Sequence, residues 1–259
     1  MLFCAKKEKN TMRMRKKKNG ESRLLACREF LLENIDEPMS DPASVIGKSG
    51  AKVFLEIGAG KGGFACKMAE KHPEAAYFAM EKVTDCVVLA AEQAKESADK
   101  RNDNLRFIVD TADNLLKIFK PGTVDAIFLN FSDPWPKKGY AKRRLTHRRY
   151  LALYLNLLCD GGTLTFKTDH VGLFDFSLDE IAALGLPLEK LTRDLHSSEW
   201  NEGNVMTEYE KNFSSKGVSI NMLEFKKPCG FFAEVSPEFY DREFYKAENK
   251  GELKEDTRQ

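Results

Sequence analysis

Two acidic residues flank a glycine-rich loop in the first half of the chain. The segment LEIGAGKGGF carries Gly58, Gly60 and Gly63 in the spacing G-x-G-x-x-G, which is typical of a turn whose backbone approaches a nucleotide-like ligand. Glu56 precedes this loop inside an otherwise apolar run. A buried carboxylate needs a partner, and the ammonium group of a ligand is one. Glu81 ends the next apolar run, where an acid can accept both ribose hydroxyls of an adenosine.

The glycine spacing alone fits a nicotinamide dinucleotide, another adenosine ligand or a structural turn. The two glutamates distinguish between the ligands. S-adenosylmethionine carries an ammonium group, a sulfonium and a ribose, so a carboxylate suits each end of the binding site. A nicotinamide dinucleotide carries a pyrophosphate and no ammonium, so Glu56 would repel it. The sequence therefore favours S-adenosylmethionine as the cofactor.

A second group of reactive residues lies in the segment LNFSDPWPKKGYAKRRLTHRRYL. Pro134 and Pro136 stiffen the turn around Trp135, and this turn presents Asp133 at the end of an apolar run. Between Lys137 and Arg149 there are seven Lys or Arg and no acid. A solvated helix start would explain such a run, but the position beside Asp133 favours contact with a phosphate backbone.

Alternating apolar runs and amphipathic segments position these residues. Strands are expected at 52–58, 76–80, 105–110, 124–129 and 163–167, with late strands within 188–196 and 219–227. Helices are expected at 22–33, 62–72, 84–100, 148–159 and 174–184, and the segment between the late strands is expected to be irregular. Alternation of this kind indicates an α/β fold with a mostly parallel seven-stranded sheet and helices on both faces.

Composition sets the outer limits on function. The chain has 259 residues, 41 Lys or Arg and 40 Asp or Glu, for a net charge of +1, which excludes a globally basic nucleic-acid binder but not local basic surfaces. The six cysteines form no C-x-x-C pair, so neither a disulfide framework nor a metal site is expected and the protein is predicted to be cytoplasmic. No apolar run is long enough for a membrane span.

Three regions follow from these patterns. Residues 1–20 are a basic arm that is expected to be disordered, with contact to phosphates as the functional alternative. Residues 21–227 form the catalytic domain. Residues 228–259 form an extension that begins with aromatic residues and ends with charged ones, and it is expected to be partly disordered.

Four separated motifs resemble those of the bacterial tRNA (guanine-N7)-methyltransferases. They are LEIGAGKG, DPWPKK with the following KRRL, FKTDH at 166–170 and MTEYEKNFSSKG at 206–217, in the family's order. The resemblance spans roughly residues 12–225. It implies a Rossmann-like, S-adenosylmethionine-dependent methyltransferase fold and transfer of a methyl group to N7 of a guanine in the variable loop of tRNA. The implied partner is tRNA, and the protein is expected to be a monomer or a homodimer.

The resemblance also implies roles for individual residues. Glu56, Glu81, Thr111 and Asp133 would line the cofactor side, together with Gly58 and Gly60 of the loop. Thr111 departs from the Asp or Asn that the family usually carries there, and the nearby Asp110 or Asp113 is the alternative. The substrate side would comprise Lys137, Asp169, Thr207, Glu208, Tyr209 and Glu210.

Guanine N7 carries a lone pair and no proton, so its methylation needs no obligatory general base. Catalysis then rests on positioning and on negative charge near the purine ring, where positive charge develops. Asp133 is predicted to supply this charge and is the catalytic residue. Asp169 or Glu210 is expected to accept from N1–H and N2–H of guanine, and Lys137 to contact a phosphate or the guanine O6.

Three alternatives remain open at this point. An amino-directed nucleic-acid methyltransferase favours an Asp-Pro-Pro-aromatic or Asn-Pro-Pro-aromatic loop, whereas here the second proline follows Trp135. A nicotinamide-dependent oxidoreductase is disfavoured by Glu56. A non-catalytic RNA-binding module would be indicated by loss of the carboxylate at 56 or 133, and both carboxylates are present.

Overall fold

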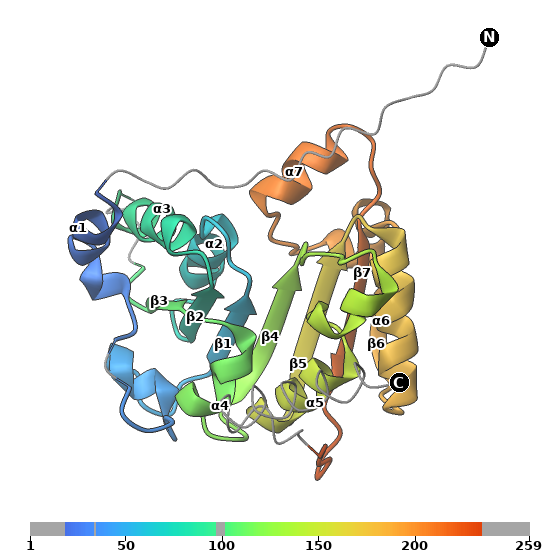
Figure 1. The fold of residues 1–259 in the computed structure, drawn as a ribbon, viewed down its shortest axis with the longest axis horizontal. Helices are drawn as coiled ribbons and strands as arrows, with labels where there is room; N and C mark the ends of the chain where they lie inside the picture. Colours follow the sequence, from blue (N-terminus) through green and yellow to red (C-terminus); the bar gives the residue numbers. More distant parts are fainter. Residues whose placement is uncertain (1–18, 34, 97–101, 235–259) are drawn as a thin grey trace, which may run out of the picture.

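A single twisted sheet runs through the molecule (Figure 1). The computed structural model describes residues 19–33, 35–96 and 102–234. Seven strands pair in the order β3-β2-β1-β4-β5-β7-β6, which confirms the expected sheet. The chain reverses direction of winding between β1 and β4, and open α/β sheets bind ligands beyond the carboxyl ends of the strands at such a point.

Five strands are parallel and two are not. The parallel strands are β1 (Val53–Ile57), β2 (Ala76–Glu81), β3 (Leu105–Val109), β4 (Val124–Asn130) and β5 (Leu158–Thr168). β7 (Asn221–Lys226) runs antiparallel between β5 and the edge strand β6 (Leu188–Thr192). Every parallel strand therefore ends at the same edge of the sheet.

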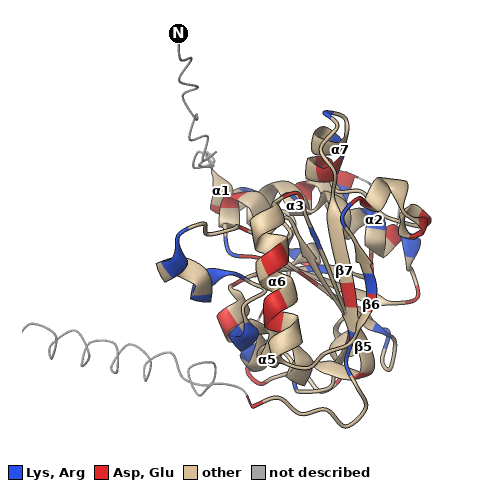
Figure 2. Ribbon diagram, turned by 90° about the vertical axis from the view of Figure 1, so that its right-hand side faces the viewer, with Lys and Arg blue, Asp and Glu red and all other residues tan. Residues whose placement is uncertain are grey.

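Helices cover both faces of the sheet (Figure 2). On one face lie α2 (Gly63–Lys71), α3 (Thr84–Glu96) and the short α1 (Gly20–Leu25). On the other lie α4 (Leu115–Ile118), α5 (Arg148–Leu157) and α6 (Val171–Ala183). Because side chains alternate along a strand, Leu55 and Ile57 pack toward α5 while Phe54 packs toward α2. Glu56 shares the α2 face with Phe54.

Two segments differ from the expectation. The helix predicted at 22–33 is only α1 followed by one 3-10 turn (Arg28–Phe30). Leu31 and Leu32 leave the helix because the edge of β3 offers unpaired backbone groups, and the Leu32 N–H donates to the Phe107 carbonyl at 2.8 Å. The segment expected to be irregular contains α7 (Glu208–Ser214), which begins at a Thr207–Glu210 capping box. That T-x-x-E signal was present in the sequence.

Smaller differences concern element ends. The helix expected to reach Cys159 ends at Leu157, and β5 starts at Leu158 instead of residue 163. Gly161 takes a φ of +78° inside this strand, and the register with β4 shifts between Val124 and Ala126. Gly161 and Gly162, which lie before the expected strand at 163–167, therefore form an irregularity within β5.

The start of the C-terminal extension packs against the domain. Asn156 of α5 donates to the Ala233 carbonyl at 2.7 Å, and the partly buried Phe231 packs against the hydrophobic core. The basic arm up to residue 18 and the extension from 235 lie outside the described residues. Asn19 and Gly20, which were assigned to the arm, lead into and begin α1.

Gly62 permits the close approach of α2 and α3. Its φ is +77°, and a Cβ at this position would lie 2.7 Å from the Ala90 Cβ on α3 and 3.0 Å from the Phe107 ring. Gly122 has almost the same φ, +76°, but nothing lies within 4 Å of its Cβ position. Comparison of these two positions therefore distinguishes the cost of backbone strain from the cost of steric overlap.

We expect Gly62→Ala to destabilise the fold by about 2–4 kcal/mol, because strain and overpacking add. Gly122→Ala is the control and should cost only about 1 kcal/mol, the strain alone. Denaturant unfolding measures both free energies. Equal losses in the two variants would contradict the steric argument.

Candidate active site

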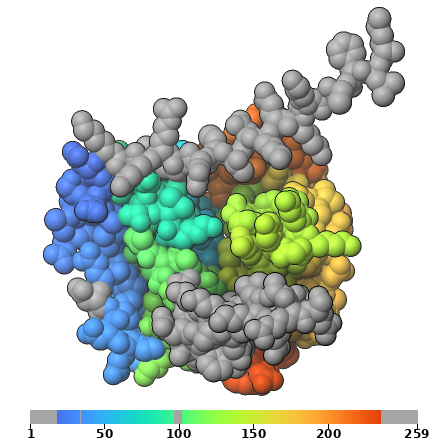
Figure 3. Space-filling model, viewed as in Figure 1, coloured from blue at the N-terminus to red at the C-terminus, as the bar shows by residue number. Residues whose placement is uncertain are grey.

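A cavity of about 700 Å³ opens at the carboxyl ends of β1, β2 and β4. Its walls come from the ends of these strands, the turn after β3, the loop after β4 and the start of α5. Figure 3 shows the hollow between the teal and the yellow-green segments. Cavities at this edge are where α/β folds bind nucleotides, so the sequence motifs and the cavity coincide.

Glu56 lies buried beside this cavity with 1% of its surface exposed. Its Oε1 accepts from the Asn130 side chain at 2.9 Å. Its Oε2 is buried and has no hydrogen-bond partner among the residues that the structure describes. Burial raises the pKa of this carboxyl to about 7, opposed by the Asn130 hydrogen bond and the charge of Lys167. A buried oxygen without a partner is the feature that a cationic ligand group would satisfy.

The glycine loop is held by Glu81. Its Oε2 accepts from the Gly60 N–H at 3.0 Å and its Oε1 from the Val83 N–H at 2.9 Å. Gly58 and Gly60 have positive φ values and open space where a Cβ would lie. The loop therefore exposes its backbone to the cavity, and Glu81 both shapes it and lines the cavity.

Thr111 and its two acidic neighbours all line the cavity. The Asp110 side chain accepts from the Thr111 N–H and from Asn114, both at 2.7 Å. Asp113 accepts from the Tyr150 hydroxyl at 2.8 Å. The structure thus brings all three candidates to one wall of the cavity, with both acids already engaged in organising the turn.

The loop after β4 is strained. Phe131 and Trp135 have φ values of +53° and +40°, a region that bulky residues rarely adopt and that is concentrated at functional sites. Arg144 stabilises the loop by donating to the Pro134 and Trp135 carbonyls, both at 3.1 Å. Asp133 lines the cavity and is exposed, with Lys82 at 3.7 Å.

Some basic residues of the run 137–149 are paired with acids, and others are exposed to solvent. Arg148 pairs with Glu180 of α6 at 2.8 Å, and Arg149 lies 3.4 Å from Asp113. The run itself contains no acid, but these two arginines are therefore paired with acids that lie outside the run in the sequence. Lys137, Lys138 and Lys142 are exposed on or beside a 3-10 turn, η4 (Lys138–Arg143), and Figure 2 shows basic residues on a segment projecting at the left.

The substrate-side candidates divide into two groups. Asp169 is half-buried and Lys137, Glu208 and Tyr209 are exposed. Tyr209 stacks on Phe213 at 4.2 Å and contacts Phe131 at 4.8 Å between ring centroids. Burial, with the charge of Asp169, raises the pKa of its phenol. Thr207 and Glu210 instead face inward as the capping box of α7.

Two site residues were missed in the sequence. Asn130 orients Glu56, and Lys167 forms a buried ion pair with Glu210 at 2.7 Å. Asn130 is the last residue of β4 and Lys167 the last but one of β5, and both lie on the same face as Glu56. The sequence signal that could have identified them is a polar residue near the end of an apolar strand, which is the signal that identified Glu56.

Comparison with known proteins decides the family. A family model described as a putative methyltransferase matches residues 50–223. A tRNA (guanine-N(7)-)-methyltransferase of Lachnoclostridium phytofermentans is 42% identical over 202 residues, which cover 76% of this chain and 92% of that protein. The chain belongs to the bacterial tRNA (guanine-N7)-methyltransferase family.

Solved structures agree with the methyltransferase fold. An antibiotic-related methyltransferase has 15% identity and a TM-score of 0.54, with 75% of this chain and 96% of that chain covered. The 16S rRNA methyltransferase KamB has 12% identity and a TM-score of 0.56, with 76% and 98% covered. At such low identity these structures support the Rossmann-like α/β fold alone.

The residues present fit the methyl donor of a methyltransferase family, S-adenosylmethionine. The unpartnered Glu56 oxygen matches an ammonium group, the open glycine loop allows close approach, and the wall at Thr111 closes the far end. Among the described residues, no helix combines the length and apolar character that a bilayer crossing requires.

For this methyltransferase we expect Glu56→Gln to lower affinity for S-adenosylhomocysteine by about 10–100-fold, since a charge-assisted hydrogen bond is lost. The fold should not lose stability, because the substitution removes a carboxylate that is costly to bury. Calorimetric titration and thermal unfolding measure the two effects. Glu224→Gln, on β7, is the control and should leave the affinity unchanged; a similar loss there would contradict the assignment.

Proposed function

We propose that this protein transfers a methyl group from S-adenosylmethionine to N7 of a guanine in the variable loop of tRNA. The observation that carries the proposal is the buried Glu56 oxygen without a partner beside a cavity whose rim holds Asp133. The related tRNA methyltransferase supports tRNA as the substrate. We expect the protein to act in the cytoplasm.

The cofactor supplies an electrophilic methyl carbon on a sulfonium. The protein's own contribution is to orient both reactants, since N7 of guanine needs no proton removed. Glu56 binds the ammonium end, Glu81 faces the ribose, and the turn at Thr111 bounds the adenine. These contacts fix the methyl group relative to the loop after β4.

Asp133 provides negative charge at the open side of the cavity. It is exposed, and within the described part of the chain its one ion pair is to Lys82 at 3.7 Å, so its carboxylate can turn toward a bound purine. Positive charge moves onto the purine ring as N7 is methylated, and a carboxylate beside the ring stabilises that charge. The strained, proline-bounded loop holds this group in place.

Asp169 is better placed than Glu210 to read guanine. Glu210 is fully buried and pairs with Lys167, whereas Asp169 is half-buried near Tyr209. A carboxylate accepting from N1–H and N2–H selects guanine over adenine. Tyr209 and Phe131 form an aromatic wall beside this position.

The tRNA backbone is bound by the η4 surface, which we define as Lys137, Lys138, Tyr140, Lys142 and Arg143. The Arg143 guanidinium lies 5.1 Å from the Trp135 ring and 4.7 Å from the Tyr140 ring. Exposed cations beside aromatic rings are typical of surfaces that bind phosphates and unstacked bases. Trp135 and Arg143 also line the cavity, so this surface leads directly to the reaction centre.

The decisive experiment is incubation with labelled S-adenosylmethionine and unmodified tRNA, followed by nucleoside analysis. We expect 7-methylguanosine, and Asp133→Ala should lower kcat by about 100-fold with little change in S-adenosylhomocysteine affinity. Asp175→Ala, which removes an exposed carboxylate from α6, is the matched control. A methylated exocyclic amine as the product, or full turnover by Asp133→Ala, would overturn the assignment.

Charge reversal tests the η4 surface. Lys138→Glu/Lys142→Glu should weaken tRNA binding at least about tenfold and flatten its salt dependence, because phosphate contacts are lost. Lys52→Glu/Lys120→Glu changes the same charge at the amino-terminal edge of the sheet and should have little effect. Filter binding at several salt concentrations gives both slopes. Identical slopes for the two double variants would place the RNA elsewhere.

A further inference from the structure

Three lysines hold residues 203–210, which lead into α7 and which we call the 203–210 segment. Lys71 and Lys67 of α2 donate to the Gly203 and Met206 carbonyls at 2.5 and 2.8 Å. Lys167 of β5 donates to the Val205 carbonyl at 3.0 Å. Backbone carbonyls outside the helices and strands thus receive charged donors from α2 and β5, which fixes this segment above the carboxyl ends of the strands (Figure 1).

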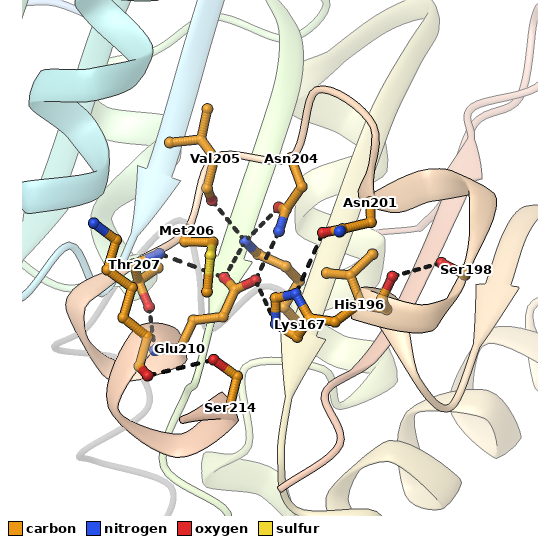
Figure 4. A network of polar contacts seen from close by, with 12 residues as sticks. Lys167, His196, Ser198, Asn201, Asn204, Val205, Met206, Thr207, Glu210 and Ser214 are labelled. Atoms are coloured by element: carbon orange, nitrogen blue, oxygen red, sulfur yellow. Dashed lines mark hydrogen bonds and ion pairs between the residues drawn. The ribbon is translucent and has the colours of Figure 1, made fainter. Parts of the chain in front are cut away.

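Lys167 differs from the other two lysines because it is buried. Besides Val205, its Nζ donates to the Asn204 side chain at 3.1 Å and to Glu210 at 2.7 Å (Figure 4). Three acceptors around one nitrogen require the protonated ammonium. The side chains of Lys167 and Glu210 are 4% and 0% exposed, so each charge compensates the other within the protein interior.

Glu210 links Lys167 to the first turn of α7. Its Oε2 also accepts from the Thr207 N–H at 3.4 Å, and its Oε1 accepts from Asn204 at 2.7 Å. The Thr207 hydroxyl accepts from the Glu210 N–H at 2.9 Å in return. The first turn of α7, which carries Glu208 and Tyr209, is therefore fixed relative to β5 through Lys167.

The same lysine faces the cofactor side. Strand alternation places Lys167 on the face that holds Glu56 and Asn130, and Asn130 is its register partner on β4. The Lys167 carbonyl accepts from the Phe131 N–H at 2.9 Å, which fixes the start of the strained loop. Its positive charge also acts on the Glu56 carboxylate. One side chain thus contacts the substrate side and influences the cofactor side.

We propose that Lys167 is a positioning residue that couples the two halves of the active site, holding α7 over the sheet while its ammonium charge supports the ionised Glu56 that binds the cofactor. This role rests on the proposed function. It assigns Glu210 to the same anchor instead of to the guanine edge, and it gives the cofactor affinity a specific dependence on pH.

The titratable neighbours of Glu56 among the described residues come from three elements, β5, β2 and α2. Lys167 on β5 favours its ionised form, whereas Glu81 on β2 disfavours it. Burial raises the pKa of Cys66 on α2 to about 12 and that of Tyr77 on β2 well above its usual value. Neither of these two titrates near neutral pH. His196 also faces this network, with its Nε2 3.4 Å from the Glu210 Oε1, so the pH dependence of cofactor affinity reports on Glu56, its charged neighbours and His196.

The test compares Lys167→Gln/Glu210→Gln with the wild type. The pair of amides removes both charges and keeps hydrogen-bonding groups, so the fold is expected to survive. We measure S-adenosylhomocysteine affinity calorimetrically from about pH 5.5 to about pH 8.5. In the wild type, affinity falls as pH drops through the Glu56 pKa of about 7. In the double variant this midpoint moves up by about one pH unit, and the KM for tRNA rises several-fold.

Two further variants separate the two roles. Lys67→Met removes another anchor of the 203–210 segment; it should raise the KM for tRNA and leave the pH midpoint in place. Lys167→Arg keeps the charge and should retain the wild-type midpoint, which gives a charge-retaining comparison even if the double variant does not fold. A midpoint that is the same in the wild type and the double variant, or one that moves equally in Lys67→Met, would overturn the coupling role.

Failure of the proposed function gives a different result. Suppose that the wild type makes no 7-methylguanosine but the pH midpoint of S-adenosylhomocysteine affinity still moves in the double variant. The electrostatic half of the coupling then stands and the substrate assignment falls. If 7-methylguanosine forms and the midpoint and the KM for tRNA are both unchanged, the reaction stands and the coupling falls.

Discussion

Burial of the Glu56 carboxylate is the constraint on which the rest of the site depends. A charged group 1% exposed at the end of a central strand is costly unless its surroundings compensate it. Here Asn130 supplies one hydrogen bond and Lys167 a nearby charge, and one oxygen keeps no partner among the described residues. The carboxylate is thereby held in place beside the cavity, and a group that is already held in place needs less reorganisation when a ligand binds.

The sheet topology explains why polar groups gather on one face. Over β1, β2 and β3 the α2–α3 layer excludes water with apolar side chains, and Gly62 allows these two helices to approach closely. Toward β4 and β5 the same face carries Glu56, Asn130 and Lys167, and the 203–210 segment covers it with carbonyls and Glu210. A polar stripe under an irregular segment is stable because each donor meets an acceptor.

Strain and rigidity are combined in the loop after β4. Phe131 and Trp135 adopt unfavourable φ values, which persist only where the surroundings determine them. The Lys167 carbonyl fixes the beginning of the loop, and Arg144 holds its proline-bounded turn. Asp133 therefore projects from a rigid support toward the cavity, while the η4 surface that follows stays exposed to solvent.

The sequence by itself determined which apolar segments form strands, where the glycine loop lies and which carboxylates stand at strand ends. Local periodicity and single residue types encode these features. It also contained, unused, the T-x-x-E capping signal of α7. Tertiary structure alone decided that Arg148 and Arg149 are paired with Glu180 and Asp113, and that Glu210 faces inward. Such pairings join residues about 30–45 positions apart, and no local rule specifies which distant charge a folded chain brings into contact.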